Sequence, residues 1–221
     1  MKKLDSNLEI IKINSLVDFT LLDPRATDVD IEKLCDIAYK NQYYAVCVNP
    51  CNVPIASGYI AKHFPDSLKV VSVVGFPLGA SSTDIKIHEA KQCLAEGADE
   101  LDVVINIGRA KSLDYDYIRN ELSLIKRIAK KHVVKAIIET CYFDENEIIK
   151  LCKQCVKAKV DFIKTSTGFG TDGANIDDLK IIVNETKGKC QVKASGGIRN
   201  RQTAVEFVNI GVTRIGTSSV I

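Results

Sequence analysis

Short apolar runs alternate with longer amphipathic stretches along the whole sequence, and this alternation constrains the fold more than any other feature. The runs are rich in Val and Ile, and their apolar residues mostly follow one another instead of alternating with polar ones. Such runs are typical of strands buried on both faces, as in a parallel sheet. Eight strands are predicted, at residues 16–21, 45–48, 70–74, 101–105, 133–138, 162–164, 191–194 and 214–216.

The stretches between these runs have the spacing of amphipathic helices. In the first one, Thr27 or Asp28 provides an N-cap, and Ile31, Leu34 and Ala38 then fall on one apolar face. The later stretches repeat this pattern. Helices are predicted at residues 27–40, 83–96, 114–131, 144–158, 177–185 and 201–208.

Eight strands alternating with helices in 221 residues predict one α/β domain, residues 1–221, folded as a (β/α)8 TIM barrel. No Pro- or Ser-rich linker divides the sequence. A doubly wound open sheet is the structural alternative, but the turn after the first strand, residues 20–23, lacks a glycine-rich phosphate fingerprint. Residues 4–14 are expected to form a short helix at the barrel bottom. Because only a few residues follow the eighth strand, we expect the last helix to be missing or vestigial.

The charge and cysteine content exclude several functional classes. The 30 basic and 28 acidic residues give a net charge of +2, which supplies no broad field for nucleic acid or an anionic membrane. No apolar stretch is long enough to cross a bilayer. No signal-peptide core follows Met1, so the eight cysteines are expected to be reduced and the protein cytoplasmic. Cys152 and Cys155 have metal or redox spacing but lack partner ligands, so no metal site is expected.

Two lysines lie inside apolar strands, where a charged ammonium is costly. Lys164 and Lys193 each precede a polar turn, at the strand ends where barrel enzymes place their chemistry. A free lysine has a pKa of about 10.4, so a nucleophilic lysine must be kept neutral by burial or by a nearby cation. The two lysines therefore offer a nucleophile and a means of activating it. Asp102 is a candidate proton relay, although Asp102 and Glu139 are equally available as simple counter-ions.

Glycine-rich turns follow the last three predicted strands, where barrels of this kind often bind phosphate. Gly168 follows the sixth strand, Gly196 and Gly197 follow the seventh, and Gly216 precedes Ser218 at the eighth. Glycines let backbone N–H groups approach an anion closely, and a helix that starts behind them adds a favourable dipole. The sequence therefore predicts a phosphate site formed by these turns.

Seven segments carry a resemblance to a known family: Cys47 to Pro50, Val74 to Gly79, the Asp102 segment through Gly108, Lys135 to Thr140, Lys164 to Gly170, Val192 to Arg199, and Arg214 to Ser219. Together they resemble the deoxyribose-phosphate aldolases, which are class I, Schiff-base-forming aldolases. The resemblance covers residues 18–219. Two lysine motifs in order, with the aspartate upstream, make it specific.

The resemblance implies reversible cleavage of 2-deoxy-D-ribose 5-phosphate to acetaldehyde and D-glyceraldehyde 3-phosphate, without a metal or an organic cofactor. It implies that Lys164 forms the Schiff base, that Lys193 keeps Lys164 deprotonated, and that Asp102 relays protons. A role in deoxyribonucleotide catabolism and a homodimer are also expected. The resemblance assigns the remaining contacts to residues that hold the phosphate or line the substrate pocket: Gly168, Gly196, Gly197, Gly216, Ser218 and Ser219 for the phosphate, and Asp18, Thr20 and Cys47 for the pocket.

Three departures from the family pattern stand out. Phe19 replaces the His that usually follows the first aspartate, and Asp23 stands where Lys is common. Asp172 replaces a frequent glycine near the phosphate turns and is expected to weaken anion affinity. The sequence ends at Ile221, where relatives commonly continue. None of these departures removes Lys164, Lys193 or Asp102.

Two other functions are compatible with these residues. Another Schiff-base barrel aldolase would form the imine but turn over deoxyribose 5-phosphate poorly. A non-catalytic sugar-phosphate binding protein would explain the departures, but a binding module needs no buried lysine pair. A cofactor-free phosphate-sugar isomerase fits less well, because no Glu and His pair occupies the strand ends.

Overall fold

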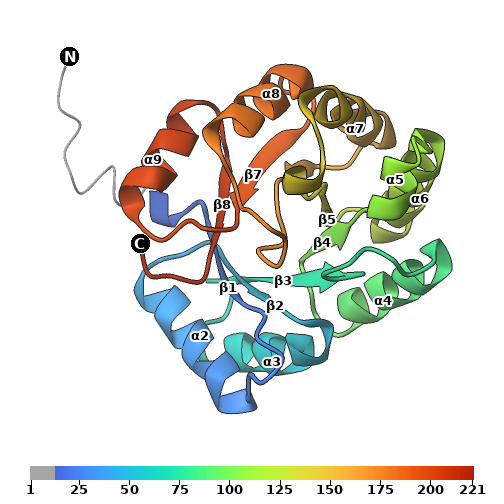
Figure 1. Cartoon of the computed structure of the whole chain (residues 1–221). Helices are drawn as coiled ribbons and strands as arrows, with labels where there is room; N and C mark the ends of the chain where they lie inside the picture. Colours follow the sequence, from blue (N-terminus) through green and yellow to red (C-terminus); the bar gives the residue numbers. More distant parts are fainter. Residues whose placement is uncertain (1–12) are drawn as a thin grey trace.

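The computed structural model describes residues 13–221 as a closed barrel of eight parallel strands in chain order. Figure 1 shows the strands at the centre and the helices in a ring around them. The predicted (β/α)8 barrel is therefore confirmed, and the open-sheet alternative is wrong. The strands are β1 (Val17–Leu21), β2 (Ala45–Val48), β3 (Lys69–Val74), β4 (Glu100–Val104), β5 (Val133–Ile137), β6 (Phe162–Lys164), β7 (Gln191–Ser195) and β8 (Arg214–Thr217).

Each strand begins and ends within one residue of its predicted bounds. The agreement has a physical cause, because strands covered on both faces contain few residues that interrupt the apolar run. The strand β2 illustrates this, since all four of its residues are buried. Strand pairing closes between β1 and β8, where Val17 pairs with Ile215 and Asp18 with Gly216. The closed sheet leaves no free edge among these strands.

Within residues 13–221, the outer layer contains the six predicted helices and two that were not predicted. Local capping explains several starts: Thr27 and Asp30 form a capping box at α2, and Asp144 and Glu147 form another at α7. The helices are α2 (Asp28–Lys40), α3 (Val53–His63), α4 (Thr83–Ala95), α5 (Ile107–Lys111), α6 (Tyr115–Ala129), α7 (Glu145–Ala158), α8 (Ile176–Thr186) and α9 (Arg201–Asn209), with 3₁₀ turns η1 (Pro50–Asn52) and η2 (Thr140–Tyr142).

The helix α3 was missed because Pro54 and Gly58 interrupt its pattern. The proline occupies the first turn, where its missing N–H costs nothing because that group has no partner within the helix. Gly58 has nothing within 4 Å of the position of an added Cβ, so it lies on an open part of the helix surface. Packing of Val53, Ala56 and Ile60 against the barrel therefore outweighs a weak local propensity.

The structure tests the prediction for the C-terminal end of the chain fully, but the prediction for the N-terminal end only in part. The predicted helix at residues 4–14 lies mostly outside the described residues, although Ile13 and Asn14 are helical. After β8, residues 218–221 form no helix, in agreement with the expected missing last helix. The backbone of Ile221 accepts from Arg201 at 2.7 Å and donates to the Tyr43 hydroxyl at 3.1 Å. Within residues 13–221, no helix is both long and apolar enough to span a membrane.

Candidate active site

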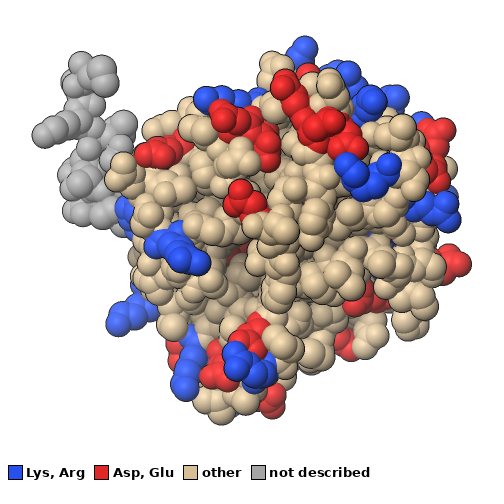
Figure 2. Space-filling view, in the orientation of Figure 1, with Lys and Arg blue, Asp and Glu red and all other residues tan. Residues whose placement is uncertain are grey.

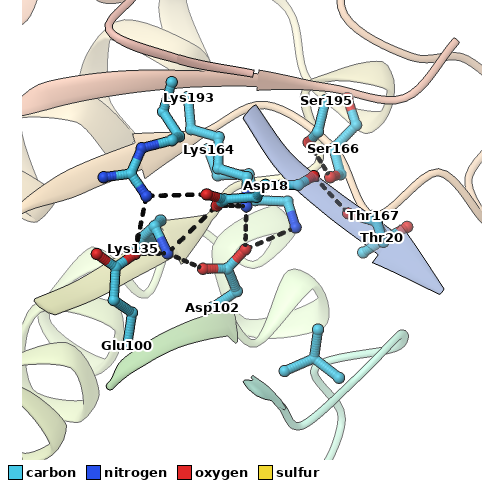
Figure 3. Close-up of polar contacts among 12 residues, drawn as sticks. Asp18, Thr20, Glu100, Asp102, Lys135, Lys164, Ser166, Thr167, Lys193 and Ser195 are labelled. Atoms are coloured by element: carbon cyan, nitrogen blue, oxygen red, sulfur yellow. Dashed lines mark hydrogen bonds and ion pairs between the residues drawn. The ribbon is translucent and has the colours of Figure 1, made fainter. Parts of the chain in front are cut away.

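Lys164 and Lys193 lie side by side inside the barrel. They are paired in the register of β6 and β7, so both side chains point to the same face of the sheet. Their Nζ atoms donate to the same oxygen of Asp102, Oδ2, at 2.9 Å for Lys164 and 2.8 Å for Lys193. Figure 3 shows the two lysines converging on this carboxylate. The three residues predicted to carry the chemistry are therefore in direct contact.

A third lysine completes the surroundings of Asp102. Lys135 on β5 is paired with Asp102 in the register of β4 and β5, and its Nζ donates to Oδ1 at 2.7 Å. The two oxygens of Asp102 thus contact three ammonium groups, and all of these side chains are at most 3% exposed. Sequence reasoning assigned no role to Lys135, although the same signal was present, because Lys135 also interrupts an apolar strand.

Two further carboxylates and an arginine extend this network toward β1 and β8. Asp18 accepts from Lys193 through a short hydrogen bond and from Arg214 Nη1 at 2.9 Å. Glu100 contacts Lys135 at 2.6 Å and Arg214 at 3.0 Å. We call the complete set the barrel cluster; its members are Asp18, Glu100, Asp102, Lys135, Lys164, Lys193 and Arg214 (Figure 3).

The barrel cluster contains three carboxylates and four basic groups. Burial disfavours the ionised acids, but the surrounding cations outweigh it, so the pKa of Asp18 is lowered to about 2 and that of Asp102 falls well below its ordinary value. Burial also disfavours the charged lysines, yet the carboxylates outweigh it and raise the pKa values of Lys135 and Lys193. With Lys135, Lys193 and Arg214 charged, the three carboxylates are already balanced. A neutral amine at Lys164 therefore leaves the buried cluster without net charge.

A cavity of about 510 Å³ opens at the carboxyl ends of β1, β6, β7 and β8. Lys164 is the one member of the barrel cluster among its lining residues. Figure 2 shows that, on the face in view, most charged side chains of both signs lie toward the periphery of the molecule. The lining residues are Thr20, Leu21, Leu22, Asp23, Pro24, Lys164, Thr167, Gly168, Phe169, Ser195, Gly196, Gly197, Ile198, Arg199, Gly216, Thr217 and Ser218.

Six of the nine predicted substrate-contacting residues line this cavity: Thr20, Gly168, Gly196, Gly197, Gly216 and Ser218. Asp18 and Cys47, both expected to line the pocket, are completely buried instead. Asp18 is covered by its contacts with Lys193 and Arg214. Cys47 packs in the apolar part of the barrel interior with Val71 and Val73, and burial raises the pKa of its thiol. Ser219 lies outside the cavity, and its N–H donates to Thr217 Oγ1 at 3.0 Å.

The predicted phosphate turns meet on one side of the cavity. Gly196 has a φ of +85°, and a Cβ at this position would lie 2.9 Å from the Cα atom of Gly173. A side chain is therefore excluded both by the backbone conformation and by the neighbouring loop. Helix α9 begins immediately behind this turn, with Asn200 as its N-cap. The turn thus places glycine backbone in the cavity wall, with the positive end of a helix dipole behind it.

The family departures fall in different places. Phe19 points away from the barrel interior and packs against Tyr43, with ring centroids 5.4 Å apart, so it belongs to the layer between barrel and helices. Asp23 lines the cavity but is paired with Arg25 at 2.8 Å. Asp172 is exposed, and its carboxylate accepts from the N–H of Gly173 at 2.7 Å. Among the three, only Asp23 is in the cavity wall.

The sequence is similar to known aldolases over most of its length. The family model of the DeoC/LacD family aldolases matches residues 12–216. The deoxyribose-phosphate aldolase of Thermococcus kodakarensis is 48% identical over 210 residues, which are 94% of this chain and 93% of that protein. The deoxyribose-phosphate aldolase of Treponema denticola is 43% identical, over 96% of this chain and 97% of its own.

Solved structures agree with the sequence matches. An aldolase designated QR15 superposes with a TM-score of 0.90 at 41% identity, over 95% of this chain and 92% of its own. The deoxyribose phosphate aldolase of Aeropyrum pernix, described as a unique tetramer, superposes with a TM-score of 0.86 at 34% identity, over 97% of this chain and 95% of its own. The family model covers most of the chain, and the relatives align over nearly all of it. The chain therefore belongs to the DeoC/LacD family of aldolases.

Proposed function

We propose that this chain is a class I aldolase that reversibly cleaves 2-deoxy-D-ribose 5-phosphate to acetaldehyde and D-glyceraldehyde 3-phosphate, through a Schiff base on Lys164. The observation that carries the proposal is the position of Lys164. It is the member of the barrel cluster that faces the cavity, and it is the basic group in excess of the three carboxylates. Both properties are what a neutral, accessible amine nucleophile requires.

The proposed reaction begins when the Nζ lone pair of Lys164 attacks C1 of the open-chain sugar. Loss of water from the carbinolamine gives an iminium ion. The hydroxyl at C3 then loses its proton and becomes the C3 carbonyl as the C2–C3 bond breaks. The electron pair of that bond forms a C1–C2 double bond while the C=N pair returns to nitrogen, which gives an enamine. D-glyceraldehyde 3-phosphate leaves at this point. Protonation of the enamine at C2, followed by hydrolysis of the imine, releases acetaldehyde and restores the amine.

Lys193 and Asp102 are proposed to set the charge around this amine. Lys193 is a cation held by two carboxylates, and its contact with the same Asp102 oxygen disfavours a second positive charge on Lys164. Asp102 is proposed to relay protons through a water molecule as the carbinolamine forms and dehydrates, because its carboxylate contacts Lys164 Nζ at 2.9 Å. Both roles require the direct contacts that join these three side chains.

The glycine turns are proposed to hold the phosphate of the substrate. Gly168, Gly196, Gly197, Gly216 and Ser218 line the same cavity as Lys164, so a phosphate held by these turns would share the cavity with the nucleophile. Arg199 is a cation in the same wall. Ser219 remains a proposed contact that would require a small movement of the last loop. Asp18 and Cys47 are proposed to act only through the barrel cluster and the shape of its interior.

A borohydride trapping experiment tests the proposed function. The protein is reduced with sodium borohydride in the presence of deoxyribose 5-phosphate and weighed intact by mass spectrometry, beside Lys164→Ala and Lys193→Ala variants. We expect an adduct that maps to Lys164 and is absent from Lys164→Ala. In Lys193→Ala, trapping should require a higher pH, because the neighbouring cation is gone. The absence of an adduct on the wild type, with binding shown separately, would favour the binding-protein alternative. Trapping without turnover would favour an aldolase of another sugar phosphate.

The cellular setting and assembly follow from the same proposal. We infer a cytoplasmic enzyme of deoxyribonucleotide catabolism that acts as a single domain and forms a homodimer, needs no metal or organic cofactor, and binds neither nucleic acid nor a membrane. The near balance of 30 basic and 28 acidic residues supports the absence of a nucleic-acid partner. Light scattering on the purified protein measures the assembly directly, and a mass equal to four chains would replace the dimer with a tetramer.

A further inference from the structure

Glu139 interrupts the regular ladder at the end of β5. Ile138 donates its N–H to the carbonyl of Lys164, and Thr140 donates to the carbonyl of Thr165, both at 3.0 Å. Between these two hydrogen bonds the β5 segment advances by two residues while the β6 segment advances by one. Glu139 is therefore an extra residue of the kind found in a β-bulge. Its φ of 52° and ψ of 66° are left-handed, a conformation that is unfavourable for a non-glycine residue. Such strain persists only where other contacts fix the residue.

The contacts that fix Glu139 come from the loop that follows β6. Its carboxylate accepts from the backbone N–H of Thr167 at 3.0 Å and, through a short hydrogen bond, from the Thr167 hydroxyl. The same hydroxyl oxygen accepts from the N–H of Phe169 at 3.0 Å. The hydroxyl thus accepts a hydrogen bond from the Phe169 N–H and donates its own hydrogen to the Glu139 carboxylate. The three residues form one directed chain around Gly168, which has a φ of +86°.

The loop also packs closely against the Glu139 side chain. A Cβ at Gly170 would lie 3.2 Å from the Cδ atom of Glu139 and 2.8 Å from the sulfur of Cys141. In Figure 1 the segment between β6 and α8 passes over the middle of the barrel. There Phe169 meets Phe76, from the loop after β3, with ring centroids 5.3 Å apart. Thr167, Gly168 and Phe169 all line the cavity. Glu139 itself does not line it, and is 1% exposed.

We infer that Glu139 is a positioning residue that sets the affinity for the phosphate end of the substrate by holding residues 167–169 in their cavity-lining conformation. The sequence allowed a different role, as a counter-ion of the lysines, but its partners here are a backbone N–H and a hydroxyl. The inference rests on the proposed function, because it takes the turn at Gly168 as part of the phosphate site. The Glu139 carboxylate does not contact Lys164. A change at Glu139 should therefore weaken phosphate recognition without changing the rate of imine formation.

The test compares phosphorylated and unphosphorylated substrates. In Glu139→Gln, the amide oxygen still accepts from the Thr167 N–H, but the amide nitrogen faces the hydroxyl and cannot accept its proton. We expect the KM for deoxyribose 5-phosphate to rise about fivefold to tenfold, the loss of roughly one buried hydrogen bond. The kcat should stay within about twofold, as should kcat/KM for 2-deoxy-D-ribose. The rate of borohydride trapping with acetaldehyde should not change.

Two valine variants supply a matched pair. Thr167→Val removes the hydroxyl that links Glu139 to Phe169, and should reproduce the effect of Glu139→Gln without adding to it in the double variant. Thr140→Val removes a buried hydroxyl from the residue next to Glu139 that has no hydrogen-bond partner, and should leave the KM unchanged. Thr167→Val also tests the inference by itself if Glu139→Gln does not fold.

The outcomes separate the inference from the proposed function. Equal losses with both substrates, or additive losses in the double variant, would show that Glu139 only stabilises the fold. An unchanged KM for deoxyribose 5-phosphate in both Glu139→Gln and Thr167→Val would overturn the inference, while trapping with acetaldehyde would leave the aldolase proposal intact. A wild-type protein that forms no adduct with acetaldehyde would instead refute the proposed function.

Discussion

Within residues 13–221, lysines are buried in two places, and the two sites differ in how their charges are matched. Between α4 and α6, Lys86 contacts Glu121 at 2.8 Å and also donates to the carbonyl of Val104 at 2.8 Å. We call this contact the helix pair. Both of its side chains are fully buried, and neither lies at the cavity. The barrel cluster is also buried, with side chains at most 9% exposed, but it joins seven ionisable residues and opens to the cavity at Lys164.

The two sites also shift the pKa values of their lysines in opposite directions. At Lys86, burial outweighs the contact with Glu121 and the weaker attraction of Glu89, and the pKa is lowered. At Lys193, burial is outweighed by Asp102 and Asp18, and the pKa is raised. A lysine with several carboxylates around it is thus a more permanent cation than one with a single partner. Lys193 can therefore act as a fixed charge beside Lys164.

The difference teaches that a buried lysine is not by itself a sign of catalysis. Lys86 has one acid for one base and no route to a ligand, which is what a structural ion pair requires. Lys164 shares its carboxylate with two other lysines and reaches the cavity. The excess of basic groups, and the opening at one of them, distinguish the barrel cluster from the helix pair. Each of the following predictions tests a part of this distinction.

The largest effect is expected from Lys164→Met. Loss of the nucleophile should lower kcat/KM for deoxyribose 5-phosphate by about 10⁴-fold or more. The free energy of unfolding should stay within about 1 kcal/mol of the wild type, because Asp102 keeps Lys135 and Lys193 as partners. Steady-state kinetics and urea denaturation measure the two quantities. A large loss of stability would mean that Lys164 is needed for charge balance and is not in excess.

The next largest effect is expected from Lys86→Met, with the opposite profile. Removing one partner leaves Glu121 buried without its cation, which should destabilise the protein by about 3 to 5 kcal/mol. The turnover of the protein that remains folded should be unchanged. Urea denaturation and kinetics at 10 °C measure both effects. The double variant Lys86→Met, Glu121→Leu should recover most of the stability, since two apolar side chains replace the pair. A double variant as unstable as the single one would contradict this account.

The fold was more accessible from the sequence than the charge network. Continuous apolar runs identify strands buried on both faces, so the barrel followed from local patterns alone. Helix α3 was missed because Pro54 and Gly58 weaken a pattern that tertiary packing restores. The placement of Asp18 could not be predicted, because which carboxylate meets which lysine depends on strand register and on closure between β1 and β8. Register is a long-range property that composition and periodicity do not contain.

Lys135, Glu100 and Arg214 show where a signal existed and where it did not. Lys135 interrupts an apolar strand as Lys164 and Lys193 do, so the same rule would have selected it. Glu100 and Arg214 stand at the first position of their strands, where a charged residue usually marks a boundary with solvent. Only the closed barrel reveals that these two face each other across its interior, at 3.0 Å. Strand-terminal charges are therefore ambiguous until the topology is known.

A smaller effect concerns the response of the barrel cluster to acid. The pKa of Asp18 is about 2 in the folded protein, below its ordinary value of 3.8, so its contribution to stability is nearly complete above about pH 5 and is lost as the pH falls toward 2. By linkage this loss is about 1 kcal/mol between pH 5 and pH 3. Denaturation at several pH values should show a shallower acid slope in Asp18→Asn. Asp177→Asn, at a carboxylate that is 86% exposed, is the matched control and should keep the wild-type slope. Equal slopes in all three proteins would contradict the prediction.

The smallest effect is expected from a charge outside both buried sites. Asp172 is exposed, and the loop that carries it touches the turn at Gly196 through Gly173. Asp172→Asn keeps an oxygen that can accept from the Gly173 N–H and removes only the charge. Because water screens an exposed charge, the KM for deoxyribose 5-phosphate should fall by only about twofold to threefold at low salt. The difference should vanish in about 0.5 M NaCl, where the Debye length is only a few ångströms. A difference that survives salt would place Asp172 in contact with the phosphate, as a desolvated charge like those of the barrel cluster.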